Sequence, residues 1–246
     1  MESKIDNRKV MKSNDPSEIL RFIEAPLEVK TLKEFEDLVF EKTKLTFIEQ
    51  MYFKEFDKIA KSISDENIKG DVVNIGIYRG GGSLYMKSVF EQLNLGEKKW
   101  WLFDSFNGFN KETITEKIEQ ESLIWFEQYL CKVKQPTAQD IRDLFTLCKL
   151  EKNTEIIEGY IEKTSTEFPN NQQICFLHID VDFGNSTYFS LNYFYPMLTK
   201  GAWVVIDDYY LNSTLCKQMV DQFINDSGAK IEPIRLGKYQ IGWRKN

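Results

Sequence analysis

The sequence has little of the chemistry that most metal and redox sites require. It contains one histidine, His178, and no two cysteines in a Cys-x-x-Cys spacing. A single histidine excludes the two-histidine helix of zinc proteases and the histidine-based facial sites of zinc and iron enzymes. The missing cysteine pairs exclude zinc fingers, zinc ribbons and thioredoxin-type redox sites. Catalysis by this chain must therefore rely on carboxylates, hydroxyls, backbone amides or a metal bound through oxygen.

Basic runs, long apolar runs and a leader pattern are missing as well. The 246 residues carry 32 Lys and Arg against 38 Asp and Glu, a net charge of −6. Because no basic run is present, we expect no nucleic-acid partner. The longest uncharged stretch, residues 183–199, is broken by Gly, Asn and Pro, so we expect no membrane span. A charged N-terminus without an apolar h-region and four unpatterned cysteines predict a cytoplasmic protein.

The sequence does contain enough apolar residues, 42%, for the core of one α/β domain with an appendage. Residues 1–70 are the predicted appendage: an irregular arm, a helix opened by a capping box at Thr31–Glu34, and a helix over 46–62. Residues 71–246 are the predicted domain, with a helical insertion at about 110–150. Its strands are expected at 71–77, 99–104, 154–158, 174–180 and 202–207, with a terminal hairpin at 231–236 and 239–244.

Strands that alternate with helices predict a doubly wound, mostly parallel sheet, and the final hairpin predicts an antiparallel terminal strand. This is the Rossmann-like α/β arrangement typical of class I methyltransferases. Ligands of such folds bind beyond the carboxyl ends of the strands. The unusual polar residues of the chain follow five of the predicted strands, at Gly76–Ser83, Asp104–Ser105, Gly159–Tyr160, Asp180–Asp182 and Asp207–Asp208. We expect them to form one site.

The first of these segments is a glycine loop, in which Gly76 precedes Gly80–Gly82. Its spacing matches neither the dinucleotide fingerprint nor the phosphate loop. In one interpretation the glycines let a ligand reach the backbone, and N–H groups near Ser83 meet an anion such as an amino-acid carboxylate. In the other, the loop is a tight turn from strand to helix. Arg79 is either the partner of that carboxylate or a solvated surface side chain.

Asp104 ends an apolar strand that follows the glycine loop in the chain. A carboxylate at this position is able to accept hydrogen bonds from both hydroxyls of a ribose, and the alternative is an ordinary aspartate of a strand-end turn. With a nucleoside bound there, Ser105 and Phe106 would lie near its adenine. Tyr160 follows the next strand and joins the same group of candidates. The arrangement favours a nucleoside-containing cofactor.

Four aspartates form the third feature, Asp180 and Asp182 after one strand and Asp207 and Asp208 after another. Carboxylates at buried strand ends repel one another unless a cation or protons compensate their charge. Their oxygens suit a hard divalent ion such as Mg²⁺. In the alternative, Asp207 and Asp208 cap the next helix and Asp182 bonds within its loop. His178 is expected to be a hydrogen-bonded core residue rather than a catalytic one.

Taken together, these segments resemble the motifs of one family. Gly70–Gly82 resembles the pattern GDVVE-GV-RGG, and Phe103–Gly108 resembles DSFxG. Ile179–Asp182 with Ser186 and Thr187 is similar to LDxDxYxST. Gly201–Tyr209 and Gly242–Arg244 are similar to GGxxxxDDY and YWRK. These motifs, spread over residues 70–246, resemble those of the macrocin O-methyltransferase (TylF) family.

The resemblance implies an S-adenosylmethionine-dependent enzyme that methylates a hydroxyl of a sugar, in a natural product or a surface polysaccharide. It implies that Asp104 holds the cofactor ribose and that Asp180, Asp207 and Asp208 coordinate Mg²⁺. Asp180 or Asp182 is then the base that lies nearest the acceptor hydroxyl. It also implies a homo-oligomer, expected as a dimer, in which N-terminal helices help to cover the site.

The chain departs from the family pattern at several positions. Asn74 stands where the family usually has Glu, and Val181 and Phe183–Asn185 replace the usual residues around the acidic loop. Two other functions therefore stay open: a catalytically silent partner that binds the cofactor, and a nucleotide-binding oxidoreductase. The missing dinucleotide fingerprint weighs against the oxidoreductase.

Overall fold

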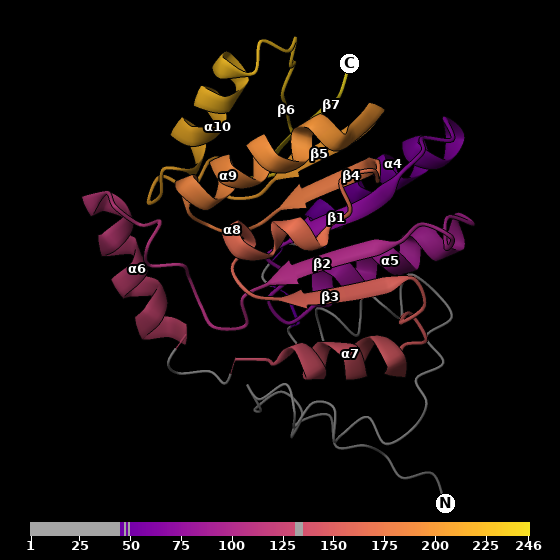
Figure 1. Cartoon of the computed structure of the whole chain (residues 1–246), viewed down its shortest axis with the longest axis horizontal. Coiled ribbons are helices and arrows are strands. Elements are labelled where there is room, and N and C mark those ends of the chain that lie inside the picture. The colour runs from indigo at the N-terminus through magenta and orange to yellow at the C-terminus, as the bar shows by residue number, and fades with distance from the viewer. Residues whose placement is uncertain (1–44, 47, 49, 131–134) are drawn as a thin grey trace, which may run out of the picture.

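The computed structural model of the chain describes residues 45–46, 48, 50–130 and 135–246. The predicted N-terminal arm and the capping-box helix at 31–34 lie outside the described residues. Within them, seven strands form one sheet in the order β3-β2-β1-β4-β5-β7-β6 (Figure 1). The strands are β1 Asp71–Ile75, β2 Trp100–Asp104, β3 Thr154–Glu158, β4 Ile174–Ile179, β5 Leu198–Ile206, β6 Ile234–Arg235 and β7 Ile241–Arg244.

The sheet is doubly wound, as the sequence predicts. Strands β1 to β5 pair in parallel, whereas β7 runs antiparallel to both β5 and β6. The predicted antiparallel terminal strand is therefore confirmed. The strand order reverses between β1 and β4. On one side of β1 the sheet continues with β2 and β3, and on the other side it continues with β4 and β5. Such a switch point opens a crevice at the carboxyl ends of the two strands.

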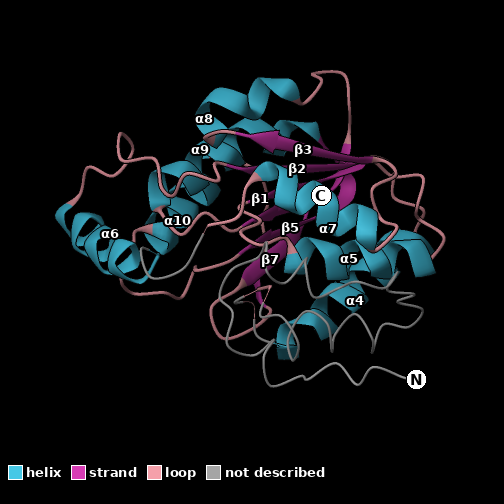
Figure 2. Ribbon diagram, turned by 90° about the horizontal axis from the view of Figure 1, so that it is seen from below, coloured by secondary structure: helices cyan, strands magenta, loops and turns pink. Residues whose placement is uncertain are grey.

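Helices cover both faces of this sheet (Figure 2). One layer holds α4 (Gln50–Asp65), α5 (Gly81–Gln92) and α7 (Ala138–Leu147). The other layer holds α8 (Ile161–Thr164), α9 (Gly184–Phe194) and α10 (Cys216–Asp226), with the short 3-10 helices η2 (Ser165–Glu167) and η3 (Tyr195–Met197). The central strands read as continuous apolar runs because a layer of helices buries each face.

Neighbouring residues of a strand accordingly belong to different cores. Val72 and Trp100 pack with the layer of α4, α5 and α7. Val73 and Trp101, one position further along, pack with the layer of α8, α9 and α10. Tryptophan and valine are both suited to this pleated, doubly buried surface. Trp100 and Trp101 are therefore core residues, one on each face of the sheet.

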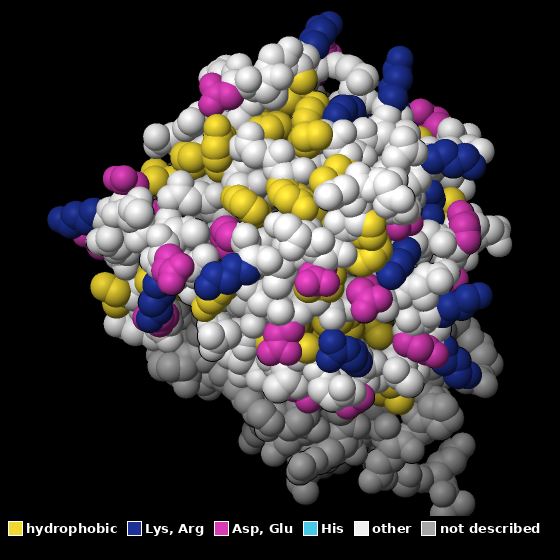
Figure 3. Space-filling model, viewed as in Figure 1, with side chains coloured by type: hydrophobic (Ala, Val, Ile, Leu, Met, Phe, Trp, Pro, Cys, Tyr) yellow, Lys and Arg dark blue, Asp and Glu magenta, His cyan; other side chains and the backbone are white. Residues whose placement is uncertain are grey.

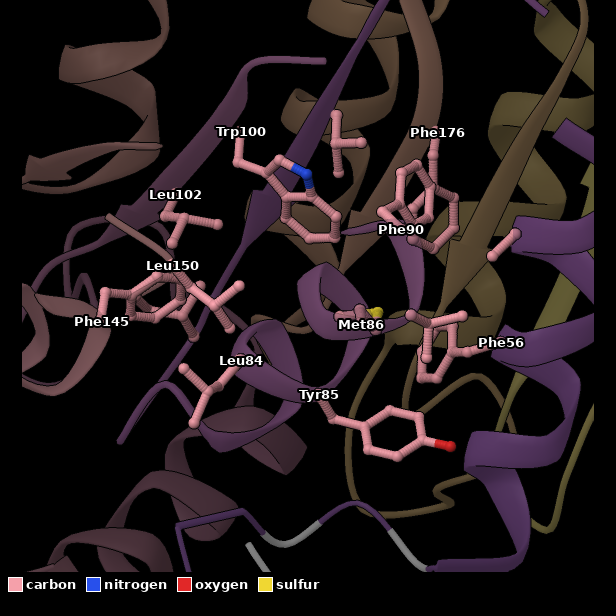
Figure 4. Packing of buried hydrophobic residues seen from close by; sticks show 14 of the residues in the cluster. Phe56, Leu84, Tyr85, Met86, Phe90, Trp100, Leu102, Phe145, Leu150 and Phe176 are labelled. Carbon is pink, nitrogen blue, oxygen red and sulfur yellow. The ribbon is translucent and has the colours of Figure 1, made fainter. Parts of the chain in front are cut away.

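Aromatic contacts fix α4 and α5 on the sheet. Figure 4 shows Phe56, Phe90, Trp100 and Phe176 in one packed group. The ring centroids of Phe90 and Trp100 lie 5.1 Å apart, and those of Phe56 and Phe176 lie 5.9 Å apart, both near edge-on. Such pairs add about 0.5–1.5 kcal/mol to the burial of their area. They hold α4 directly against β4, the strand that carries His178.

Several elements differ from their predicted bounds, among them α4 and β5. Helix α4 runs to Asp65 rather than Ser62, because Asn67 adopts φ of 48° and the N–H of Ile68 bonds to the carbonyl of Ile63. Strand β5 begins at Leu198 rather than residue 202. The N–H of Gly201 bonds to the carbonyl of Lys245, so the ladder with the last strand continues past the glycine.

The predicted helical insertion contains α6 (Lys117–Leu130) and α7. Helix α7 packs beside β3, whereas α6 stands apart from the sheet on the side to which the arrowheads of β2, β3 and β4 point (Figure 1). It lies at the end of the sheet where ligands are expected. No helix of the described part of the chain is long and apolar enough to cross a membrane.

Candidate active site

The carboxyl ends of β1, β2, β4 and β5 surround a cavity of about 950 Å³. The switch point between β1 and β4 lies in its wall, and α6 with the segment before it adds a further wall. The structure therefore brings the predicted segments together at one place. The predicted site residues that line the cavity are Gly76, Ser83, Asp104, Ser105, Tyr160, Asp180, Asp182, Asp207 and Asp208.

Two predicted residues, Arg79 and Gly80, do not belong to this wall. Arg79 is buried, and its guanidinium carbon lies 5.2 Å from the ring centroid of Tyr78. The interpretation of Arg79 as a solvated surface side chain is therefore wrong. Gly80 adopts φ of 77°, and a Cβ atom at Gly80 would lie 3.3 Å from Cγ2 of Ile141 in α7. Neither residue lines the cavity, and contact of Arg79 or Gly80 with a cofactor stays a prediction.

Gly76 has a structural reason to be glycine. It adopts φ of 79°, and a Cβ atom there would lie 1.7 Å from the carbonyl oxygen of Asp180. The ends of β1 and β4 come this close because the N–H of Asp180 bonds to the carbonyl of Ile75 at 2.8 Å. The backbone of Gly76 also lines the cavity. The turn interpretation is thus confirmed at Gly76, whereas its contact with a ligand stays a prediction.

The Asp104 carboxylate organises the loops on either side of it. Its Oδ2 accepts hydrogen bonds from the N–H groups of Ile77 and Tyr78, and its Oδ1 accepts one from Phe106, each at 2.8 Å. Burial raises the pKa of Asp104, while these N–H groups act to lower it. A carboxylate has about four acceptor positions. Backbone groups take most of these positions, and binding of a ribose by Asp104 stays a prediction.

Strained backbone is concentrated at the cavity. Tyr78 and Phe106 adopt φ of 51° and 48°, and Asp182 and Asp208 adopt φ of 62° and 58°. All four line the cavity. Non-glycine residues in this region cost on the order of 1–3 kcal/mol each, and they cluster at functional sites where the surrounding structure maintains them. Asp104 maintains two of them, because it binds the N–H groups of both Tyr78 and Phe106.

The acidic residues raise one another's pKa values. Burial and the charges of Asp207, Asp208 and Asp182 hold the pKa of Asp180 well above its usual range. Burial and the Asp182 charge do the same to Asp208. Burial and the Asp207 charge raise the pKa of Asp182 to about 6, against a hydrogen bond from Asp208. Among the described residues, the charges that act on Asp180, Asp182 and Asp208 are those of neighbouring aspartates.

This donor set fits a hard divalent cation in its chemistry, since carboxylate oxygens are preferred ligands of Mg²⁺. The described residues contain no group of three His, Cys, Asp or Glu side chains already placed around a single metal position. The fit therefore lies in the uncompensated negative charge that these buried aspartates share. Coordination of a metal by Asp180, Asp207 and Asp208 stays a prediction.

His178 is the centre of a buried hydrogen-bond chain. Its Nε2 lies 2.7 Å from Oδ2 of Asp207, and its Nδ1 lies 2.8 Å from Oδ1 of Asn74. Nδ2 of Asn74 donates in turn to Oγ of Ser83 at 2.7 Å. The expectation that His178 is a hydrogen-bonded core residue is confirmed. The sequence signal for this chain was Asn74, a polar residue within an otherwise apolar strand interior. The face of the molecule shown in Figure 3 carries acidic and basic side chains, and no histidine is visible on it.

Glu119 of α6 is a residue that sequence reasoning missed. Its side chain is buried, and Oε1 accepts hydrogen bonds from the N–H groups of Gly184 at 2.8 Å and Leu215 at 3.0 Å. These groups open α9 and α10, so the carboxylate meets the positive ends of two helix dipoles. Asn185 also donates to the carbonyl of Thr113 at 2.6 Å. The insertion is thereby fastened to the segment after the acidic loop. A glutamate on a helix carries no sequence signal for such a role.

Aromatic side chains line the cavity beside the acidic loop. The ring centroid of Phe183 lies 4.8 Å from that of Phe109 and 5.9 Å from that of Phe126. Trp125 of α6 is 63% exposed and lines the same cavity. Such rings offer an apolar surface against which a ligand ring is able to stack. The acidic loop thus has charged oxygens on one side and an aromatic surface on the other.

The sheet order, the antiparallel β7 and the cavity at the switch point define the fold of class I methyltransferases. The model of the macrocin O-methyltransferase (TylF) family matches residues 21–245 of the chain. The chain belongs to this family and is an S-adenosylmethionine-dependent O-methyltransferase. Its sequence is 24% identical over 203 residues to mycinamicin III 3''-O-methyltransferase of Micromonospora griseorubida, covering 82% of this chain and 78% of that protein.

Two further proteins support the same assignment. The 8-demethyl-8-(2,3-dimethoxy-alpha-L-rhamnosyl)-tetracenomycin-C 4'-O-methyltransferase of Streptomyces olivaceus is 23% identical over 185 residues, covering 75% of this chain and 69% of that protein. The solved structure of the O-methyltransferase NovP has a TM-score of 0.73 at 21% identity, with 82% of each chain covered. At this identity the structural likeness concerns the fold.

Proposed function

We propose that the protein methylates a hydroxyl of a sugar, in a glycosylated natural product or a surface polysaccharide, with a divalent cation at the acceptor end of the cavity. The observation that carries the proposal is the cavity that joins Asp104, whose carboxylate accepts three backbone hydrogen bonds, to a cluster of buried aspartates. Among the described residues, the charges that act on this cluster are those of the aspartates themselves. The name of the Streptomyces olivaceus relative describes a rhamnosyl acceptor.

The cofactor end is assigned to the strand ends of β1, β2 and β3. Oδ1 of Asp104 would accept one ribose hydroxyl, and Ser105 and Tyr160 would line the nucleoside. Gly76 and Ser83 would face the amino-acid end, where the backbone lies open to the cavity. Arg79 and Gly80, which do not line the cavity, would support the loop rather than touch the cofactor.

The acceptor end is assigned to the acidic cluster. Asp180, Asp207 and Asp208 would hold Mg²⁺, and a bound divalent ion lowers the pKa of a hydroxyl and neutralises nearby carboxylates. Because the methyl group of S-adenosylmethionine is already electrophilic, the protein has to align the acceptor oxygen and remove its proton.

Asp182 is the base that the electrostatics favour. Its pKa, raised to about 6, lies near neutral pH, where a general base is most effective. Asp180, the other candidate, is enclosed by Asp207, Asp208 and Asp182, so its carboxylate is better placed to hold a cation. The aromatic rings of Phe109, Phe126 and Phe183 would hold the acceptor against the acidic loop and keep water away from it.

Turnover of sugar acceptors that carry vicinal hydroxyls, measured with and without EDTA, tests this function. We expect chelation to reduce turnover at least about 100-fold and added Mg²⁺ to restore it, since such ions stabilise the reacting charges by several kcal/mol. Undiminished turnover in EDTA would contradict the metal role.

Substitution of one predicted ligand provides the matched test. Asp207→Ala is expected to remove turnover while S-adenosylhomocysteine still binds within about twofold of the unmodified protein, measured by calorimetry. Asp65→Ala is the control, because Asp65 is an exposed carboxylate at the far end of α4 that pairs with Lys61. It should retain full turnover.

A further inference from the structure

The proposed chemistry assigns no role to His178, a buried polar residue. His178 is 1% exposed, yet it belongs to the wall of the cavity. It is the only histidine of the chain, and its Nε2 contacts Asp207, a predicted cation ligand, at 2.7 Å. A buried imidazole costs free energy unless both nitrogens have partners, and here both do.

The direction of the hydrogen bonds follows from Asn74. With the Asn74 amide oriented so that Nδ2 donates to Ser83, its Oδ1 is the atom that faces His178. Nδ1 of His178 therefore carries a proton and donates it to that oxygen. The opposite nitrogen, Nε2, shares a hydrogen bond with Oδ2 of Asp207. The hydrogen-bond chain Ser83–Asn74–His178–Asp207 thus connects the first turn of α5 to the acidic cluster.

The imidazole ring has little freedom to turn away from this arrangement. The ring of Phe56 in α4 meets it edge-on with centroids 5.3 Å apart, and the ring of Phe176 lies 6.3 Å away and nearly parallel. Strand β4 fixes its backbone between β1 and β5, where His178 pairs with Asn74 and Val205. Asp207 therefore meets an imidazole whose position is set from several elements.

We propose that His178 is a positioning residue that fixes the Asp207 carboxylate toward the cation, with Asn74 and Ser83 fixing the imidazole. This inference rests on the proposed function, because it takes Asp207 as a ligand of the cation. By holding Oδ2, His178 leaves Oδ1 of Asp207 as the oxygen available to the cavity. Groups that hold a ligating side chain in this way typically account for 10–100-fold in metal affinity or activity.

The chain also connects the two ends of the site. Ser83 lines the cavity at the end assigned to the cofactor, and Asp207 lines it at the acceptor end. The contribution of each member to cation affinity should therefore fall with its distance along the chain from Asp207. A histidine that served packing alone would give no such order. In the described part of the chain, Asn74 is joined to Asp207 through His178, and Ser83 is joined to it through Asn74 and His178.

Calorimetric titration with Mg²⁺, in the presence of S-adenosylhomocysteine and without acceptor, measures the effect apart from turnover. We expect His178→Gln to weaken Mg²⁺ binding about 10–100-fold, with a smaller loss for Asn74→Ala and the smallest for Ser83→Ala. Ser88→Ala is the matched control, because Ser88 is a buried serine of the same helix whose Oγ bonds only to the carbonyl of Tyr85. It should bind Mg²⁺ like the unmodified protein.

A kinetic measurement separates positioning from packing. For His178→Gln, saturating Mg²⁺ should return most of kcat, whereas the Mg²⁺ concentration for half-maximal activity stays raised. In His178→Gly, free imidazole should restore Mg²⁺ affinity, because the site opens to the cavity. Unchanged Mg²⁺ affinity in His178→Gln and Asn74→Ala, with Mg²⁺ bound by the unmodified protein, would overturn this inference alone. Absence of Mg²⁺ binding by the unmodified protein would remove the proposed metal role and this inference together.

Discussion

Two groups of carboxylates line one cavity, and their buried charge is compensated in opposite ways. Asp104 receives three backbone N–H groups, from Ile77, Tyr78 and Phe106. Asp180, by contrast, is surrounded by further carboxylates, which hold its pKa well above its usual range. Buried charge requires hydrogen bonds or a counter-charge. Backbone amides compensate the charge of Asp104, whereas protons or a cation must compensate the charge of the Asp180 cluster.

The difference shows which half of the cavity the protein builds in advance. The loops around Asp104 are held in strained conformations by the carboxylate itself, so this half is formed before a ligand arrives. The acidic half keeps excess negative charge, with His178 on Asp207 as its single basic partner among the described side chains. Changes to the Asp104 half or to the acidic half of the cavity should therefore have different effects.

The largest effect is expected from Asp104→Ala. It leaves three N–H groups without their acceptor and releases the strain at Tyr78 and Phe106. Since each unsatisfied buried donor costs about 1–3 kcal/mol, we expect the free energy of unfolding to fall by at least about 2 kcal/mol. Affinity for S-adenosylhomocysteine should fall as well. Urea unfolding and calorimetry measure both, and an unchanged stability would show that water replaces the carboxylate.

An intermediate effect of opposite sign is expected from Asp208→Asn. Removing one negative charge relieves the repulsion within the cluster, and the amide is able to donate to Asp180 or Asp182. In EDTA this variant should be more stable than the unmodified protein by about 1 kcal/mol, which is less than the cost of a charge pair at close range. It should also lose the rise in Tm that Mg²⁺ produces in the unmodified protein. A lower Tm in EDTA would mean that the cluster does not repel itself.

A third effect is expected in the pH dependence of stability. The pKa of Asp182 is about 6 in the folded protein against 3.8 as its ordinary value, so the folded state binds more protons between these values. In EDTA, stability should therefore fall as pH rises from about 4 to 6. Saturating Mg²⁺ should reverse the trend, because a cation requires ionised ligands. Urea unfolding across this pH range measures the pH dependence of stability for the unmodified protein and for Asp182→Asn. If Asp182 is not responsible, the two proteins will show the same pH dependence.

Much of the fold followed from local patterns. The segments at 100–104 and 154–158 have the length and residue types of strands. The glycine loop before α5 predicts a turn from strand to helix. The convergence of Asp104 with the four aspartates followed as well, because the carboxyl ends of parallel strands share one edge. Contacts between distant segments did not follow: the bond of Glu119 to Gly184 and Leu215 joins residues that no local pattern relates.

By itself, the sequence determined the class of the protein and the kind of chemistry available to it. One histidine and no cysteine pair restrict a metal to oxygen ligands, and the acidic strand ends point to where it would bind. Only the tertiary structure decided how each carboxylate is compensated, because that depends on which amides and charges the fold brings within hydrogen-bond reach. The same packing buried Arg79 beside Tyr78, gave Asp104 three backbone donors, and set the only histidine against Asp207.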